Sequence, residues 1–349
     1  MGFEDSLRDV ALTLVRFSGF AANALVFGTL AVILLVLRPT FATLDPEAWA
    51  RGRARLAERL EGIVHSALVG AAAAAALALV LQAVLTAELS GGEVDSGSFT
   101  SVLETSFGTW YALRLPLIAG LLVLLTGKVR QWALATRATD ASVAAPAWWV
   151  AWGGLGVALL ATSSFSGHAA VATPRFVSLT SDVVHLVAGA TWFAGIVLLS
   201  IAIPDAWVGE DERARLQVLS PAVRHFSRVA IVAIGIVLAT GVIGSLLHVA
   251  HPGDLVSSAY GITLTVKIAF FGLVLALGGF NHFVIRRRFE RALEHSEEAG
   301  GAARIFRKSI AAELVVGLVL MGLTGWLTGQ ARTRQVVVQP ASETAAQER

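Results

Sequence analysis

Cysteine is absent from this chain of 349 residues, and methionine occurs only at Met1 and Met321. The chain therefore has no disulfide, no thiolate metal site and no CxxC redox pair. Among the soft and borderline ligands for transition metals only histidine remains, with eight copies. A metal site in this protein must be built from imidazole and oxygen ligands.

Charged residues are also scarce. They make up only 15% of the chain, against roughly a quarter in a soluble domain. Hydrophobic residues make up 55%, and the mean hydropathy is +0.70. These values exclude a soluble enzyme, a disordered protein and a nucleic-acid-binding module, and they indicate a protein that crosses the lipid bilayer several times. No Walker loop, GxSxG or HExxH motif occurs, so we assign no catalytic residue and expect neither an enzyme nor an ATP-driven pump.

Long apolar runs predict an all-α bundle of about eight transmembrane helices. Each run has roughly 20 residues, the length needed to cross ~30 Å of hydrocarbon. No run alternates with period two over ten residues, so a β-barrel is not expected. The first run ends at Arg38-Pro39 and the seventh at Asn281-His282. The runs are centred on Ala24, Ala74, Gly120, Gly156, Ala190, Val237, Leu273 and Leu320.

Lysine and arginine are unequally distributed between the two sets of loops. Five, three, four and seven of them lie in segments 38–61, 128–146, 204–228 and 285–308, respectively. The alternate loops, at 87–107, 166–178 and 248–261, hold only Arg175. Because basic loops stay in the cytoplasm, we expect a multi-pass protein of the cytoplasmic membrane with both termini outside. This distribution also explains the pI of about 9.4 without an acidic partner.

The chain divides into three segments by composition. Residues 1–146 hold the first three helices and a cytoplasmic loop, 147–331 hold the other five helices, and 332–349 form a polar tail that we expect to be disordered. The first ten residues are acidic rather than basic, so a signal peptide is not expected and the first helix is retained.

Ionisable side chains inside the spans are costly in a bilayer, so each is a candidate functional residue. Asp182 and His185 are spaced i, i+3 in the fifth span and share one helix face. His168 lies in the outer loop before that span, and His248 and His251 lie at the outer end of the sixth span. Imidazoles with a nearby carboxylate suit Cu(II), Zn(II) or Ni(II), so we expect these residues to bind a metal ion.

A second tier of histidines lies toward the cytoplasm. His65, His225 and His282 stand at the inner ends of the second, sixth and seventh spans, and His295 lies in the charged loop that follows. Each histidine near a helix end has the simpler alternative of capping carbonyl groups or contacting water. If His65, His225 and His282 act as ligands, they would form a second ligand site on the cytoplasmic side.

Other charged side chains at membrane depth lie in the outer half, namely Arg16, Arg114 and Lys267 of the first, third and seventh spans. They are expected to pair with Asp182, to line an entrance for a coordinated anion, or to extend to the outer interface. We assign all three to the surroundings of the metal site or to the ion pathway.

Two polar residues lie toward the inner side of the last two spans. Asn281 closes the seventh span, and Glu313 of the eighth span is expected to form a structural ion pair with Arg228 or Arg224. We place Asn281 and Glu313 along the ion pathway.

An ordered set of motifs runs through residues 165–330. It consists of Ser166-Gly167-His168-Ala169, Asp182-x-x-His185, Ala190-Thr191-Trp192-Phe193-x-Gly195, Arg224-x-Phe226-Ser227-Arg228, Thr240-Gly241, Tyr260-Gly261-x-x-Leu264-x-x-Lys267, Asn281 and Glu313. Together these motifs resemble the copper resistance protein D family, the CopD-type inner-membrane proteins. The first four helices fit that family in number more than in motif.

The resemblance implies copper handling, usually uptake across the cytoplasmic membrane, with a periplasmic or extracellular copper-binding protein of the CopC type as partner. Without cysteine and with one internal methionine, a sulfur-lined Cu(I) pathway cannot form, which favours Cu(II) binding at the outer face. We therefore expect a copper permease in which His168, His185 and either His248 or His251 capture the ion.

Two alternatives remain open. The outer group of His168, His185 and His248 and the inner group of His65, His225 and His282 would each supply two axial ligands to b-type haem. The protein would then be a transmembrane electron carrier or a metal reductase. The other alternative is an assembly or sensor protein that transports nothing.

Overall fold

The computed structural model describes residues 3–44, 50–134, 146–209, 212–294 and 299–330. Eight candidate membrane spans occur in these residues, and no strand does. The all-α membrane bundle of about eight helices is therefore confirmed. His295 and the tail 332–349 lie outside the described residues.

The spans are built from the following elements. They are α1 (Phe3–Val32), η1 (Ile33–Leu37) and α2 (Arg38–Phe41); α3 (Ala50–Ser90); α5 (Ser106–Leu125) and α6 (Lys128–Leu134); α7 (Pro146–Ser166); α8 (Arg175–Val197), η3 (Leu198–Ala202) and α9 (Ile203–Ala206); α10 (Glu212–His248); α12 (Ala259–Phe280), η4 (Asn281–Ile285) and α13 (Arg286–Glu294); and α14 (Ala299–Leu327). Short helices occur in the connections, namely α4 (Ser96–Glu104), η2 (His168–Ala170) and α11 (Asp254–Ser257).

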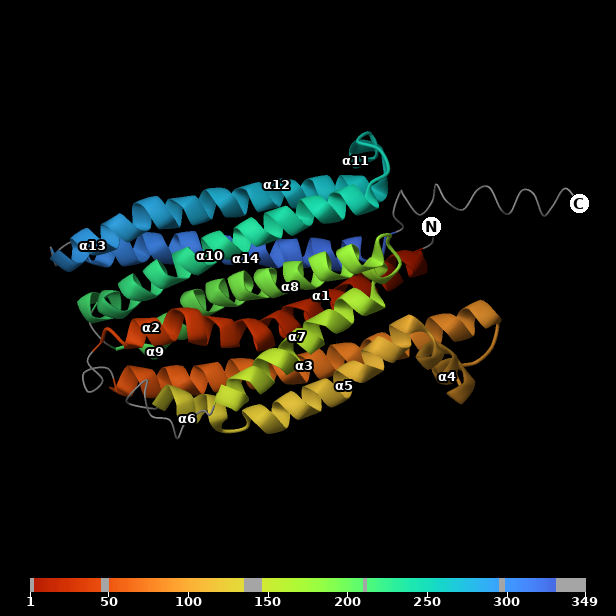
Figure 1. The fold of residues 1–349 in the computed structure, drawn as a ribbon, viewed down its shortest axis with the longest axis horizontal. Coiled ribbons are helices and arrows are strands. Elements are labelled where there is room, and N and C mark those ends of the chain that lie inside the picture. Colours follow the sequence, from red (N-terminus) through yellow and green to blue (C-terminus); the bar gives the residue numbers. More distant parts are fainter. Residues whose placement is uncertain (1–2, 45–49, 135–145, 210–211, 295–298, 331–349) are drawn as a thin grey trace, which may run out of the picture.

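The long helices run side by side along one axis of the molecule (Figure 1). One end of the bundle carries α4 and α11, together with the start of α1 and the end of α14, and we call it the α11 end. The opposite end carries α2, α6, α9 and α13, and we call it the α13 end.

The spans that contain α1 and α8 lie at the centre of the bundle. Their most apolar windows are 61% and 67% buried, whereas the corresponding window of α10 is only 6% buried. α1 packs against α3, α7, α8 and α14, and α8 packs against α1, α7, α10 and α14. A Cβ atom at Gly28 of α1 would overlap the carbonyl oxygen of Ala190, so glycine permits the closest approach of the two central helices. α8 thus holds its polar residues in a fixed position.

Three π-helical turns interrupt the spans. Leu37 and Ala202 end the first two, and each is followed two residues later by a proline, Pro39 and Pro204. A proline removes one helical hydrogen bond and its ring displaces the carbonyl four residues before it, which explains both wide turns. The expected ends at Arg38-Pro39 and Asn281-His282 were wrong, because the helices continue through these turns to Phe41 and Glu294.

Candidate metal site

A small cavity near the α11 end brings together four of the residues singled out in the sequence. Asp182 and His185 reach it from α8, His248 from the end of α10, and Lys267 from α12. Thr324 of α14 lies on its wall, and the cavity has a volume of about 150 Å³. Residues separated by more than 80 positions in the chain therefore share one small polar space.

The spacing along α8 explains how this helix lines the cavity. Ser178, Asp182 and His185 are separated by four and three residues, so they lie on one helix face. Asp182 and His185 were expected from the sequence, but the hydroxyl groups were not. The four-residue spacing of Ser178 from Asp182 was the signal for one of them. The cavity is also lined by Ser178, Ser181, Thr240, Ser245, Tyr260, Thr324 and Thr328.

The half-buried imidazole of His185 has a defined orientation. Its Nδ1 lies 2.9 Å from the hydroxyl oxygen of Thr240. That hydroxyl group donates its proton to the carbonyl oxygen of Ile236, at 2.6 Å. With its own proton donated to Ile236, the Thr240 oxygen accepts from His185 in the tautomer that carries the imidazole proton on Nδ1. The lone pair on Nε2 is left available, as a metal ligand requires.

Lys267 brings its side-chain amino group into the cavity beside Asp182 and His185. In its ammonium form it interacts electrostatically with both groups. At membrane depth a carboxylate requires a nearby positive charge, and Lys267 supplies it to Asp182. A metal ion bound beside Asp182 would supply that positive charge instead of Lys267, and the ammonium group would repel the ion.

Two other histidines, His251 and His168, were also expected as ligands. His251 is exposed, its backbone N–H donates to the carboxylate of Asp254 at 3.0 Å, and it does not line the cavity. His168 begins η2, and its side chain is outside the described part of the structure. Among the described residues, no three histidine, aspartate or glutamate side chains converge as a preformed metal site.

Arg114 is buried between α5 and α7, with only 5% of its surface exposed. Its Nε donates to the hydroxyl group of Thr162 at 2.8 Å, and its Nη2 donates to those of Ser163 and Ser166 at 3.2 and 3.3 Å. The guanidinium carbon also lies 3.6 Å from the ring centre of Tyr111, a cation–π contact. Its hydrogen-bond acceptors come from α7 and its ring contact from α5, whereas one expectation from the sequence paired it with Asp182.

Arg16 is half-buried on α1 and does not line the cavity. A Cβ atom at Gly329 would overlap its Nη1, so the guanidinium group lies against the C-terminal end of α14. A cation at this position is favoured by the free carbonyl groups and by the helix dipole. Arg16 therefore contacts the chain just after α14. The nearby residues Thr324 and Thr328 line the cavity.

Glu313 and Asn281 lie together in the half of the bundle nearer the α13 end. The Nδ2 of Asn281 donates to Oε2 of Glu313 at 2.8 Å, and both side chains are buried. Arg224 and Arg228 are exposed, and neither forms an ion pair with Glu313 in the described part of the chain. The expected ion pair was therefore wrong, and Asn281 takes its place.

The inner histidines do not gather around one space. His282 lines a cavity of about 410 Å³ that neither His65 nor His225 lines.

His185 and His248 do share a cavity, but its 150 Å³ is well below the ~300 Å³ or more of pockets for larger ligands. This volume favours a small ion over haem. A Soret band in the absorption spectrum of the purified protein would reverse that conclusion.

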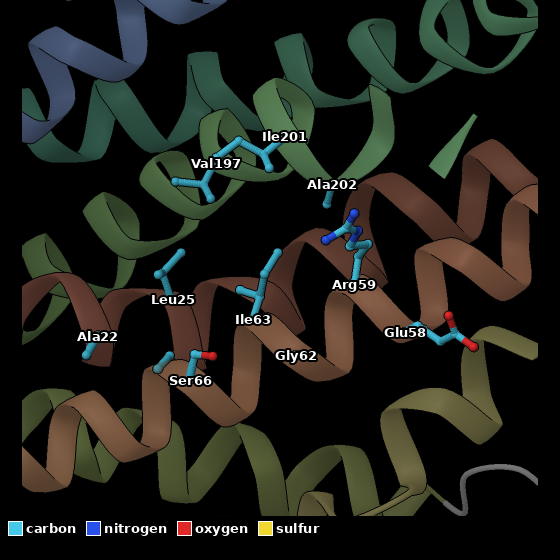
Figure 2. Close-up of a pocket in the computed structure, with 11 residues that line it drawn as sticks. Ala22, Leu25, Glu58, Arg59, Gly62, Ile63, Ser66, Val197, Ile201 and Ala202 are labelled. Carbon is cyan, nitrogen blue, oxygen red and sulfur yellow. The ribbon is translucent and has the colours of Figure 1, made fainter. Parts of the chain in front are cut away.

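A groove of about 570 Å³ lies between α1, α3 and the fifth span (Figure 2). Apolar side chains such as Leu25 and Val197 face it, with Glu58 and Arg59 nearer one end (Figure 2). Glu58 pairs with Arg130 at 3.2 Å, and Arg59 lies 3.7 Å from Asp205. Because these charges are already paired and no histidine lines the groove, it is not a candidate metal site.

The fold and the cavity define a class of helical membrane protein with eight candidate spans and a small space lined by imidazole, carboxylate and hydroxyl groups near one end. Two family models match the chain and identify its family within this class. The copper resistance protein D model matches residues 220–327, and the copper resistance protein D-like N-terminal domain matches residues 7–174. Together they span most of the chain, which belongs to the copper resistance protein D family.

The N-terminal match extends the family assignment beyond the motifs that carried the sequence resemblance. His248, Lys267, Asn281 and Glu313 fall inside the second matched region. Asp182 and His185 fall between the two regions.

Two curated relatives are similar to this chain. Copper resistance protein D of Pseudomonas syringae pv. tomato is 34% identical over 176 residues, which are 50% of this chain and 56% of the relative. Copper transport protein CutJ of Bacillus subtilis (strain 168) is 28% identical over 249 residues, which are 70% of this chain and 43% of the relative. The matches thus span about half the length of each relative. No solved structure matches the chain.

Proposed function

We propose that this protein captures Cu(II) at the outer face of the cytoplasmic membrane and carries it inward. The observation that supports this most directly is the cavity shared by Asp182, His185 and His248 in a member of a copper resistance family. One relative is named a copper transport protein, and neither is named for an enzymatic reaction.

The orientation follows from the distribution of basic residues. The loops at the α13 end lie in segments rich in arginine and lysine, whereas the loops at the α11 end hold only Arg175. By the positive-inside rule, the α11 end would face outward, and with it the cavity, the start of α1 and the end of α14. A copper-binding protein of the CopC type, implied by the family resemblance, would deliver the ion to this end.

The ligands determine which oxidation state is favoured. Cu(I) prefers thiolate and thioether ligands, and the chain offers no cysteine. Nε2 of His185, an imidazole nitrogen of His248 and a carboxylate oxygen of Asp182 suit Cu(II). Since Lys267 lies among them, binding requires its ammonium group to move away from Asp182. His168 begins η2, in the connection between α7 and α8, and would join the ligands from there.

Copper accumulation in cells tests the proposal. Cells that express the wild-type chain should accumulate more radioactive copper than cells that express His185→Ala at the same membrane level. The reason is that removal of one imidazole removes capture at the entrance. His65→Ala serves as the control, because His65 is half-buried in α3 and does not line the cavity. Lower copper content with the wild-type chain than with His185→Ala would indicate export and contradict the proposal.

A further inference from the structure

The cavity of about 410 Å³ lies between α10, α12 with η4, and α14. Most of its wall is apolar, from side chains such as Val223, Leu238 and Phe306. Asn281 and Glu313 add a polar patch to this wall. Polar groups placed together in an otherwise apolar space inside a membrane bundle require an explanation.

Glu313 has too few partners for an ionised group. Only 3% of its surface is exposed, and within the described part of the chain its carboxyl group accepts a hydrogen bond from Asn281 alone. The indole of Trp192 lies near the carboxyl group, but its N–H does not reach hydrogen-bond geometry. A carboxylate removed from water with a single donor is costly, so this group needs either a cation or a proton.

The neighbouring side chains have buried atoms without partners. Oδ1 of Asn281 and Nδ1 of His282 are both buried and form no hydrogen bond. Buried polar atoms are satisfied in the great majority of cases, so two from side chains that line the same cavity as Glu313 are unusual. The amide oxygen and the ring nitrogen both carry lone pairs, as does the carboxylate of Glu313. Such a set attracts a cation.

The backbone at this point is also unusual. π-helical turns account for well under 1% of residues, and they concentrate at functional sites. η1 and η3 are explained by the prolines that follow them, but no proline follows η4. η4 begins at Asn281, includes His282 and packs against α14, which carries Glu313. Its wide turn therefore coincides with the polar patch.

We propose that Glu313, Asn281 and His282 form a second metal-ion site that accepts Cu(II) on its way toward the cytoplasm. Carboxylate and amide oxygens with one imidazole are suitable ligands for Cu(II). The site deepens the proposed transport function and rests on it for the identity of the ion. Along α8, Trp192 lies seven residues beyond His185, about 10 Å at the helical rise. Glu313, near Trp192, would thus hold the ion one step deeper than the cavity at the α11 end.

Copper stoichiometry of the purified, detergent-solubilised full chain tests the proposal. Wild-type protein dialysed against Cu(II) should retain two equivalents, and Glu313→Gln should retain one. Glutamine keeps an oxygen that accepts from Asn281, so the fold should be preserved while the charge is removed. Glu290→Gln is the matched control, because Glu290 is an exposed glutamate near the α13 end paired with Arg286 at 3.5 Å. It should retain two equivalents.

The outcomes separate this site from the cavity at the α11 end. Loss of one equivalent in Glu313→Gln and of the other in His185→Ala supports both sites. Loss in Glu313→Gln but not in His185→Ala supports the second site and contradicts the assignment of the first. Two equivalents retained in Glu313→Gln, or a single wild-type equivalent that this variant keeps, overturns the proposal and leaves Glu313 as a protonated structural residue.

Discussion

Replacing His185 with alanine is expected to lower the affinity of the purified protein for Cu(II) by at least ~100-fold. Even the loss of a group that only orients a ligand typically costs ~10–100-fold in metal affinity, and His185 is proposed as a ligand itself. When Thr240 accepts the hydrogen bond from Nδ1, Nε2 is available to bind without rearrangement of the imidazole. Competition with a chelator of known affinity measures the change.

Matched variants show whether this loss is specific. His65→Ala should bind as the wild-type protein does, and His251→Ala should change affinity little because His251 is exposed outside the cavity. Thr240→Val should weaken binding by roughly tenfold, since the imidazole keeps its nitrogen but loses the acceptor that orients it. An unchanged affinity in His185→Ala would contradict the assignment of this cavity.

Replacing Lys267 with leucine, which adds no ligand atom, is expected to raise the affinity for Cu(II) by about tenfold or more. In the protein without metal, the ammonium group stabilises Asp182, and after binding it repels the ion. Leucine removes both effects, and each removal favours binding. Unit charges ~6 Å apart at an effective dielectric constant of ~20 interact by about 3 kcal/mol, and tenfold requires about 1.4 kcal/mol.

The charge of Lys267, and not its size, should cause this change. Lys267→Arg keeps the positive charge and should bind copper with wild-type affinity or more weakly. Lower affinity in Lys267→Leu than in the wild-type protein would mean that the ammonium group supports binding, for example through an anion coordinated to the metal. The same competition assay measures both variants.

The spans, and some of the residues that line the cavity at the α11 end, could be predicted from the sequence because the bilayer imposes simple rules. A span needs about 20 apolar residues, and an ionisable residue within one, such as Asp182 or Lys267, is exceptional. The helical repeat places Asp182 and His185 on one face from their spacing alone. These rules depend on a single helix and its solvent, so no knowledge of the neighbouring helices is needed.

Contacts between helices could not be predicted in this way. The ion pair expected for Glu313 was wrong because charge alone does not determine which face of α14 meets which neighbour. Packing brings Asn281 to Glu313 instead, through the wide turn of η4. The bond between His185 and Thr240 likewise depends on how α8 and α10 are aligned. Pro39 was expected to end a helix, but the π-helical turn before it lets the span continue to Phe41.

Electron paramagnetic resonance of the wild-type protein loaded with one equivalent of Cu(II) reports whether nitrogen atoms coordinate the ion. Ligation by His185 and His248 should give nitrogen superhyperfine splitting, with a simpler pattern when either histidine is replaced by alanine. A spectrum without nitrogen splitting, or one that the His185→Ala and His248→Ala variants share with the wild-type protein, would contradict this ligation.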